Sequence, residues 1–268
     1  MQCRVPYRMG LIEVGCGRCK ACRITRQSAW IGRLTAEGLD HTEVSFWTLT
    51  YAENPGVLIY EHIQRWVKRV RKRYPKFRYF VVGEYGEQGG RPHWHVVSFS
   101  GPPVGRGVRG DRIMSWPYGY VLAGPVEAGA YRYVAGYVLK RSVRDPIVRM
   151  SLRPGIGLRR LTLLGERAGL AAKARPFLKL PTKVTVSNRV YPLYGGGRRA
   201  FEKGFFKAGG SLMRMAPEDK VALYLRLKAE DRAAYWSENE GNRFGSRDLH
   251  LIEQERIRWE GVERRTKL

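Results

Sequence analysis

Residues 91–99 have the sequence RPHWHVVSF and decide how the middle of the chain folds. A second run with strand composition, residues 79–85, precedes them across a glycine-containing turn, so the two runs predict a β-hairpin. Side chains alternate across a strand, which places His93 and His95 on the same face of this hairpin. The sequence therefore predicts two imidazoles held close together on a rigid sheet.

Two imidazoles in this arrangement can bind a divalent cation, and a nearby carboxylate would complete an open metal site. Glu84 on the partner strand is the first candidate for that carboxylate, and Glu87 in the turn is the second. Histidines two residues apart also occur as ordinary surface side chains of an edge strand. The hairpin alone does not separate these two explanations.

A second element, residues 133–140 with the sequence YVAGYVLK, predicts a helix. Tyr133, Tyr137 and Lys140 then share one face, because residues i, i+4 and i+7 stack on a helix. Tyrosine is a poor nucleophile at its ordinary pKa of about 10, but a neighbouring cation favours the phenolate. An amphipathic helix with two half-buried tyrosines and a lysine reaching solvent explains the same spacing.

Taken together, the histidine strand and the tyrosine helix resemble the HUH endonucleases, which nick single-stranded DNA through a phosphotyrosine bond. FWTLTY at 46–51 occupies the place of that family's first motif. Three further segments are similar to the replication initiators of the Microviridae, especially the gokushovirus branch: VGEYGE at 82–87, RPHWH at 91–95 and SLRPGIG at 151–157. The similarity runs from Cys3 to about Gly157. Gly136 departs from the larger residue expected there and weakens the helix by about 1 kcal/mol relative to alanine.

The resemblance implies an α+β fold, with an antiparallel central sheet and helices on one face, as in HUH nucleases and RRM-like domains. The predicted order of strand, helix, strand, hairpin strand, strand and helix agrees with such a sheet, whose other face stays free for substrate. It also implies that Tyr133 and Tyr137 are nucleophiles, that Lys140 stabilises the phenolate or scissile phosphate, and that His93, His95 and Glu84 bind Mg²⁺ or Mn²⁺. The residues expected to contact DNA are Thr48, Thr50, Arg91, Arg106, Arg109 and Arg153.

All four cysteines lie within the first 22 residues, at Cys3, Cys16, Cys19 and Cys22. In a chain from a reducing compartment, this clustering argues against disulfides and favours four thiolates around one metal. Structural zinc fits best, because a closed four-sulfur site can stabilise a segment too short to fold alone. An iron–sulfur cluster and four free thiols are the alternatives.

The charge is strongly basic: 49 lysine and arginine residues against 24 acidic ones give a net charge of +25. Such an excess suits a polyanionic partner, and nucleic acid is the first candidate. We expect no membrane association, since no apolar run approaches the roughly 20 residues of a membrane span. The N-terminus lacks the apolar region of a signal peptide, so we expect a cytoplasmic protein, in a bacterial host if it is viral.

The sequence predicts four regions: a cysteine-rich segment and helix (1–42), an endonuclease core (43–145), a basic DNA-binding region (146–215) and a charged helical tail (216–268). The helix at residues 23–38 carries Arg23, Arg26 and Arg33 on a face expected to meet phosphates or solvent. Residues 141–214 hold 17 basic and three acidic residues, and aromatic residues among them are candidates for base stacking.

These observations predict a rolling-circle replication initiator that nicks and rejoins single-stranded DNA at a phage origin, with host replication proteins as further partners. Two alternatives stay open. One is a transposase or relaxase of the same nuclease superfamily, which would differ in substrate. The other is a zinc-containing nucleic-acid-binding protein without catalytic activity.

Overall fold

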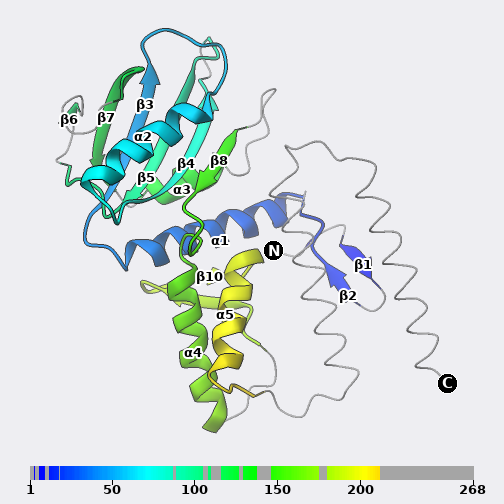
Figure 1. Ribbon diagram of the computed structural model, residues 1–268. Helices are drawn as coiled ribbons and strands as arrows, with labels where there is room; N and C mark the ends of the chain where they lie inside the picture. The colour runs from blue at the N-terminus through cyan, green and yellow to red at the C-terminus, as the bar shows by residue number, and fades with distance from the viewer. Residues whose placement is uncertain are drawn as a thin grey trace.

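The structure, a computed structural model, describes residues 3, 6–9, 12–17, 19–86, 89–104, 108–109, 116–126, 129–137, 146–174 and 180–211. A six-stranded antiparallel sheet with helices packed against it forms the larger part, and a smaller helical part lies beyond α1 (Figure 1). The predicted α+β class with an antiparallel central sheet is confirmed.

The sheet has the strand order β6-β7-β3-β5-β4-β8. Its strands are β3 (Val44–Tyr51), β4 (Arg78–Tyr85), β5 (Pro92–Phe99), β6 (Val108–Arg109), β7 (Gly119–Pro125) and β8 (Ile147–Met150). The helices are α1 (Lys20–Gly38), α2 (Tyr60–Arg73), α3 (Ala130–Tyr137), α4 (Leu158–Ala174) and α5 (Gly195–Lys207). Two separate hairpins pair β1 (Tyr7–Met9) with β2 (Ile12–Val14), and β9 (Lys183–Val186) with β10 (Arg189–Pro192).

The first face of the sheet packs against α2. Every second residue of β3 is buried, and these buried residues join the apolar side of α2 in one core. Trp94 on β5 fills the middle of this core and donates its indole N–H to the Tyr51 hydroxyl at 3.0 Å, so its polar end is satisfied. Its register partner Gly83 leaves the room for the indole, because a Cβ at that position would overlap the ring.

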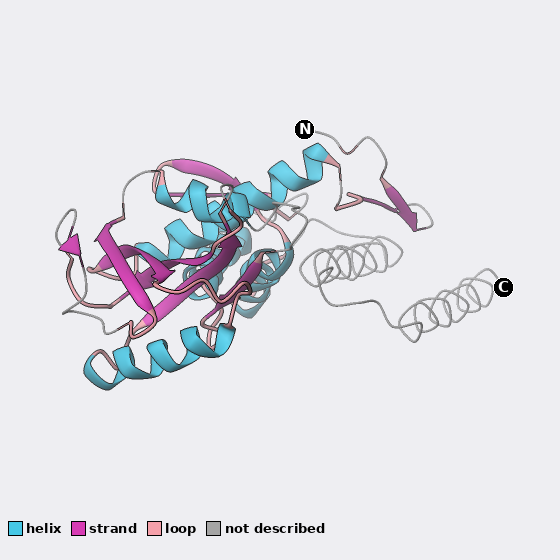
Figure 2. Cartoon of the chain, turned by 90° about the horizontal axis from the view of Figure 1, so that it is seen from above, coloured by secondary structure: helices cyan, strands magenta, loops and turns pink. Residues whose placement is uncertain are grey.

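The second face of the sheet is also covered by helices, which corrects the prediction that helices lie on one face only (Figure 2). Phe80, Val97 and Phe99 point to this face and are fully buried against Trp30 of α1 and Val134 of α3. The reason is the composition of β4 and β5, which are apolar on both sides and lose water contact only if both sides are covered.

The helical part consists of α4, α5 and the β9–β10 hairpin, on the far side of α1 from the sheet (Figure 1). Glycines allow α4 and α5 to approach closely: a Cβ at Gly165 would overlap the carbonyl oxygen of Phe201. The sheet and this part draw on several predicted regions, since α1 of the first region covers the sheet and β8 of the basic region extends it.

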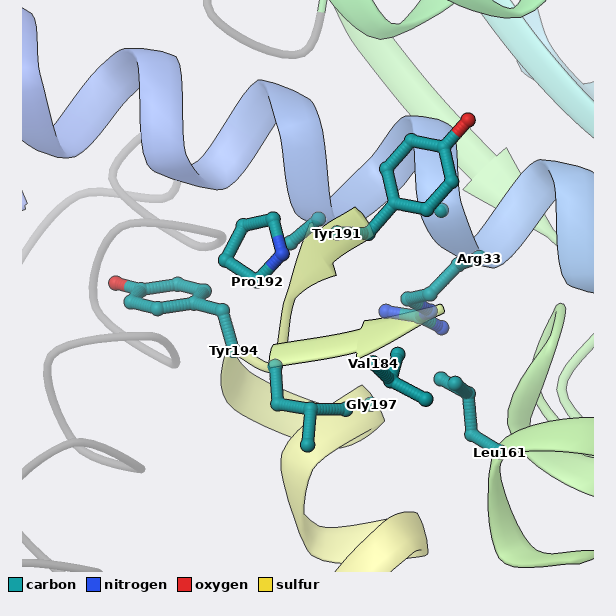
Figure 3. Close-up of a pocket in the computed structure, with 10 residues that line it drawn as sticks. Arg33, Leu161, Val184, Tyr191, Pro192, Tyr194 and Gly197 are labelled. Carbon is teal, nitrogen blue, oxygen red and sulfur yellow. The ribbon is translucent and has the colours of Figure 1, made fainter. Parts of the chain in front are cut away.

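Arg33 of α1 joins the two parts from inside. Its guanidinium donates to the carbonyl of Ile156 at 3.0 Å and stacks on the Trp30 ring at 3.8 Å, and Arg26 is buried as well. The expectation that these arginines face phosphates or solvent was therefore wrong. A cavity between α1, β10 and α5 has a volume of about 10 Å³, which is room for about one water molecule and not for a ligand (Figure 3).

Glu37, near the end of α1, holds three distant elements together. One carboxylate oxygen accepts a hydrogen bond from Arg78 of β4 and lies 3.4 Å from Nε2 of His41. The other accepts the backbone N–H of Gly157 at 2.6 Å. Burial alone would raise the pKa of this carboxyl, but the bonds from His41, Arg78 and Gly157 lower it to about 2.

Among the described helices, none is both long enough and apolar enough to cross a bilayer.

Candidate active site

The candidate active site lies on the second face of the sheet, where β4, β5 and β3 run side by side. The register pairs Glu84 with His93 and Thr50 with His93, and it pairs Thr48 with His95. Directly paired residues point to the same face, so four strand positions converge without any contribution from a loop. The predicted shared face of His93 and His95 is confirmed by this register.

Glu84 lies at the centre of the two imidazoles. Its Oε1 is 2.7 Å from Nε2 of His93 and 2.9 Å from Nε2 of His95. Glu84 and His95 are buried, whereas the side chain of His93 is 17% exposed. Burial alone would raise the pKa of Glu84, but hydrogen bonds and charge from both histidines lower it to about 2. The carboxylate is therefore ionised throughout the neutral range.

The far nitrogens of both imidazoles are held by the sheet. Nδ1 of His93 lies 3.2 Å from the carbonyl oxygen of Arg91, which can only accept, so this nitrogen carries a proton and donates. Nδ1 of His95 lies 3.2 Å from Oγ1 of Thr48. These contacts turn both Nε2 atoms toward Glu84, the orientation that metal-binding histidines adopt when a neighbour fixes the other nitrogen.

The three side chains could hold a metal ion, because their ligand atoms lie within 4.8 Å of one another. In an octahedral site with bonds of about 2.1 Å, adjacent ligand atoms are about 3.0 Å apart. The separations of 2.7 and 2.9 Å agree with that value. The donor set of one carboxylate and two imidazoles leaves further coordination positions for a substrate oxygen.

The two predicted tyrosines of α3 lie over this cluster. The Tyr133 hydroxyl is 3.3 Å from Nε2 of His95, and the Tyr137 ring stacks on the His95 ring with centroids 5.7 Å apart. The two tyrosine rings meet edge to face at 4.9 Å. Burial, followed by hydrogen bonding to Tyr133 and the charge of Glu84, raises the pKa of Tyr137. Tyr133 is 46% exposed and the more accessible phenol.

The remaining predicted residues are distributed as follows. Lys140, Glu87 and Arg106 lie outside the described residues, and Arg109 lies in β6, where only the backbone is described. Arg91 is exposed at the hairpin end, where it donates to the carbonyls of Tyr51 and Ala52. Arg153 is exposed beside Arg78, and Arg78 is six residues from Glu84 on β4, so Arg153 is about 20 Å from the cluster.

The four cysteines form a second cluster at the start of α1, as predicted. Sγ of Cys19 is 3.7 Å from Sγ of Cys3, and all four sulfur atoms lie within 4.8 Å of one another. The backbone N–H groups of Cys16 and Cys19 point at Sγ of Cys3 and Cys16, at 3.4 and 3.3 Å. Burial and the neighbouring thiols raise the pKa of Cys22 to about 12. Tetrahedral Zn–S bonds of about 2.3 Å place sulfur atoms about 3.8 Å apart, which fits this cluster.

Two further residues of the site face were missed by the sequence reasoning. Tyr120 and Leu122 of β7 are exposed on the same face as Thr48 and Thr50, which are their register partners. The alternation of residues 119–125 was the available signal, because it places these two large side chains opposite the buried Val121 and Ala123.

Comparison with known proteins agrees with this geometry. Residues 44–142, which contain the histidine cluster and the tyrosine helix, match a family described as replication-associated proteins of the ORF2 type. The Replication-associated protein ORF4 of Chlamydia phage 1 is 32% identical over 152 residues, covering 48% of this chain and 38% of the relative. This chain is related to phage replication-associated proteins. The predicted resemblance to the initiators of Microviridae phages is confirmed.

Two other relatives have the same kind of name. The Replication-associated protein VP4 of Bdellovibrio phage phiMH2K is 26% identical over 52% of this chain and 51% of its own length. The Replication-associated protein ORF2 of Spiroplasma virus 4 is 29% identical over 34% of this chain and 32% of its own length. The chain thus spans about half the length, or less, of these relatives. No solved structure matches it.

Proposed function

We propose that this protein nicks and rejoins single-stranded DNA at a phage replication origin through a tyrosine–phosphate bond. The observation that carries the proposal is the position of the Tyr133 hydroxyl, 3.3 Å from His95, directly over the Glu84–His93–His95 cluster. A nucleophile beside a cation site is the arrangement needed to attack a phosphodiester that the same cation orients. The match of residues 44–142 to replication-associated proteins supports the same reaction class.

Glu84, His93 and His95 would hold the cation, and Mg²⁺ or Mn²⁺ suits the donor set and spacing. Such an ion would polarise a non-bridging oxygen of the scissile phosphate. Thr48 and the Arg91 carbonyl keep the two imidazoles in place, so the site is rigid before DNA arrives. Glu84 stays ionised at neutral pH and supplies the negative charge that attracts a divalent cation.

Tyr133 makes the first attack in this proposal, because it is the more exposed phenol and stands nearest His95. Its oxygen forms a bond to phosphorus while the bond from phosphorus to the 3′ oxygen breaks. The phenolic proton is lost to solvent and the departing 3′ oxygen gains one. The products are a 5′-phosphotyrosine and a free 3′-OH that a host polymerase can extend. The covalent bond conserves the phosphoester energy, so rejoining requires no nucleotide cofactor.

Tyr137 provides a second nucleophile one helical turn away. Its ring lies against both His95 and Tyr133, so it reaches the same phosphate position after a small shift of the DNA. A second strand transfer can then occur while Tyr133 is still occupied. This division of labour would allow one molecule to cut and circularise a unit-length genome in the bacterial host.

The cysteine cluster is proposed to bind structural zinc. The four sulfur atoms have tetrahedral spacing, and two backbone N–H groups already point at sulfur, as they do around thiolates bound to a metal. The cluster joins Cys3 to the first turn of α1, so zinc would fix the N-terminal segment to the helix that covers the second face.

DNA binding is proposed to extend beyond the active site over the helical part. Several basic side chains are exposed there, whereas Glu166 and Glu202 are the acidic residues that the described segments 146–174 and 180–211 contain. The exposed basic side chains are Arg159, Arg167, Lys173, Lys183, Arg189, Arg199, Lys203 and Lys207. Their charge would attract the phosphate backbone and make affinity sensitive to salt.

The test is a covalent-adduct assay with labelled single-stranded origin DNA and Mn²⁺, analysed on a denaturing gel. We expect a metal-dependent adduct that Tyr133→Phe reduces most and the Tyr133→Phe/Tyr137→Phe double variant abolishes. Tyr131→Phe is the matched control, because Tyr131 lies on the same helix but packs into the core of the second face.

Other outcomes assign the alternatives. Tight DNA binding without an adduct on several origin sequences would contradict the catalytic proposal and leave a binding protein. An adduct that forms equally on any hairpin DNA would assign the chain to the transposase or relaxase type of substrate.

A further inference from the structure

The second face of β7 exposes two large side chains in a sheet that is otherwise well covered. Tyr120 is 65% exposed and Leu122 is 56% exposed, whereas Val121 and Ala123 on the same strand are buried on the first face. An aromatic and an aliphatic side chain two residues apart on a strand form one continuous apolar surface. Surface of this kind beside a functional site commonly marks a binding position.

The register places this surface in line with the candidate metal ligands. Tyr120 pairs with Thr50, which pairs with His93, which pairs with Glu84. Neighbouring strands are about 4.8 Å apart, so the backbone of β7 is about 10 Å from that of β5. The Thr50 hydroxyl, between the two, donates to the carbonyl oxygen of Tyr120 at 3.4 Å.

The second row repeats the arrangement. Leu122 pairs with Thr48, whose hydroxyl contacts His95 below the Tyr133 phenol. A ligand that reaches from Tyr133 toward β7 therefore passes over threonine hydroxyls and then meets an apolar surface. A nucleotide has the matching parts, since its phosphate and sugar are polar and its base has flat faces suited to stacking.

We propose that Tyr120 and Leu122 form a stacking platform for a base next to the scissile phosphate of single-stranded DNA. The proposal rests on the nuclease function above and adds the residues that position its substrate. Single-stranded DNA is favoured over a protein partner by charge, since the chain has a net charge of +25 and exposes Arg132 beside Tyr133. A duplex would keep its bases paired and would not offer a free face to the Tyr120 ring.

Stacking on an aromatic ring tolerates every base, because each base has a π-face. Tyr120 is therefore expected to fix the position of the strand and not its sequence. Held in this way, the next phosphate along the strand cannot slide past the metal ligands, which favours in-line attack by Tyr133.

The experiment measures equilibrium binding of the Tyr133→Phe/Tyr137→Phe variant to labelled oligothymidine of about 16 nucleotides, with chelator present. Under these conditions neither cleavage nor metal contributes. Adding Tyr120→Ala should weaken binding by about 5-fold to 150-fold, and Tyr120→Phe should restore it. Leu122→Ala should give a smaller loss. Leu170→Ala on α4 is the matched control, because this leucine is 58% exposed and lies in the helical part.

A second oligonucleotide with the same backbone but abasic at every position separates stacking from a structural effect. The loss caused by Tyr120→Ala should vanish on this oligonucleotide, because no base remains to stack. An equal loss on both oligonucleotides, or an effect no larger than that of Leu170→Ala, would overturn the proposal. If adducts still form on origin DNA in that case, the nuclease function stands and only the platform is lost.

If the wild-type chain forms no adduct but Tyr120→Ala weakens oligothymidine binding as expected, the platform stands and the nuclease function fails. Self-association or protein capture that depends on Tyr120, without any base-dependent effect on DNA binding, would assign the surface to a protein partner and reject the DNA proposal.

Discussion

The backbone N–H of Gly157 donates a 2.6 Å hydrogen bond to Oε2 of Glu37, although the two residues are 120 positions apart. The same carboxylate accepts from Arg78, so it ties α1, β4 and the segment before α4 to one buried point. Removing such a group leaves an unpaired arginine and an unpaired N–H away from water.

Glu37→Gln should therefore destabilise the protein by about 2–3 kcal/mol at pH 7. The pKa of Glu37 is lowered in the folded state from an ordinary value of 4.5 to about 2. The stabilisation is thus complete above about pH 4.5 and is lost as pH falls toward 2. Urea denaturation followed by tryptophan fluorescence should show the variant and wild type converging over that range. Glu166→Gln, whose ion pair with Lys207 is exposed, should change stability by less than about 1 kcal/mol at any pH. A pH-independent difference for Glu37→Gln would contradict the role assigned to its charge.

Metal binding should depend on the histidine cluster. Replacing His95 with alanine removes a ligand, and even the loss of a group that only supports a ligand typically weakens affinity by about 10- to 100-fold. Calorimetric titration with Mn²⁺ should therefore show a larger loss for His95→Ala than for Thr48→Val, which removes only the contact to Nδ1. His62→Gln is the control, because this histidine stacks on Tyr118 next to α2. Equal affinity in all three variants would exclude this cluster as the metal site.

Zinc content should depend on the cysteines at the start of α1. Protein purified with zinc should contain about one zinc ion per chain by elemental analysis, and Cys19→Ser should lose it. Chelation should expose the N-terminal segment to proteolysis before residue 20 while the sheet stays folded, since the sheet has its own core. Ser28→Ala on α1 is the control. Retention of zinc by Cys19→Ser would argue against a four-sulfur site.

Two helical glycines should respond in opposite directions to alanine. At Gly165 a Cβ would overlap the carbonyl oxygen of Phe201, so Gly165→Ala should push α4 and α5 apart and destabilise by about 1–3 kcal/mol. At Gly136 the nearest atom to a Cβ is Nε2 of Gln27 at 3.5 Å, an ordinary contact. Gly136→Ala should stabilise α3 by about 1 kcal/mol through helix propensity. Thermal unfolding of both variants tests this, and a stabilised Gly165→Ala would show that the two helices are not in contact.

The parts of the site that were predictable from the sequence are those set by local periodicity. Alternation along β5 gave the shared face of His93 and His95, and helical spacing gave the shared face of the tyrosines on α3. Glu84 followed because a hairpin fixes its own register. These are short-range relations, and a single sequence contains them.

The parts that were missed depend on pairings distant in sequence. The buried position of Arg33 is set by the carbonyl of Ile156, 123 residues away, and nothing in the spacing of α1 indicates that partner. The second layer of helices was missed for the same reason, since the apolar residues of α1 do not say which sheet face they cover. Tyr120 became visible only once β7 was paired with β3.

The hydrogen bond between Glu37 and Gly157 also sets an order of events on the ribosome. The sheet has all its strands once Met150 has been made, so it can assemble while α4 and α5 are still to be synthesised. Glu37 must then wait for its last partner: at about 5–20 residues per second, 120 residues take roughly 6–24 s. Premature chain termination after β8 would leave a complete ligand cluster beside a partly unpaired buried carboxylate.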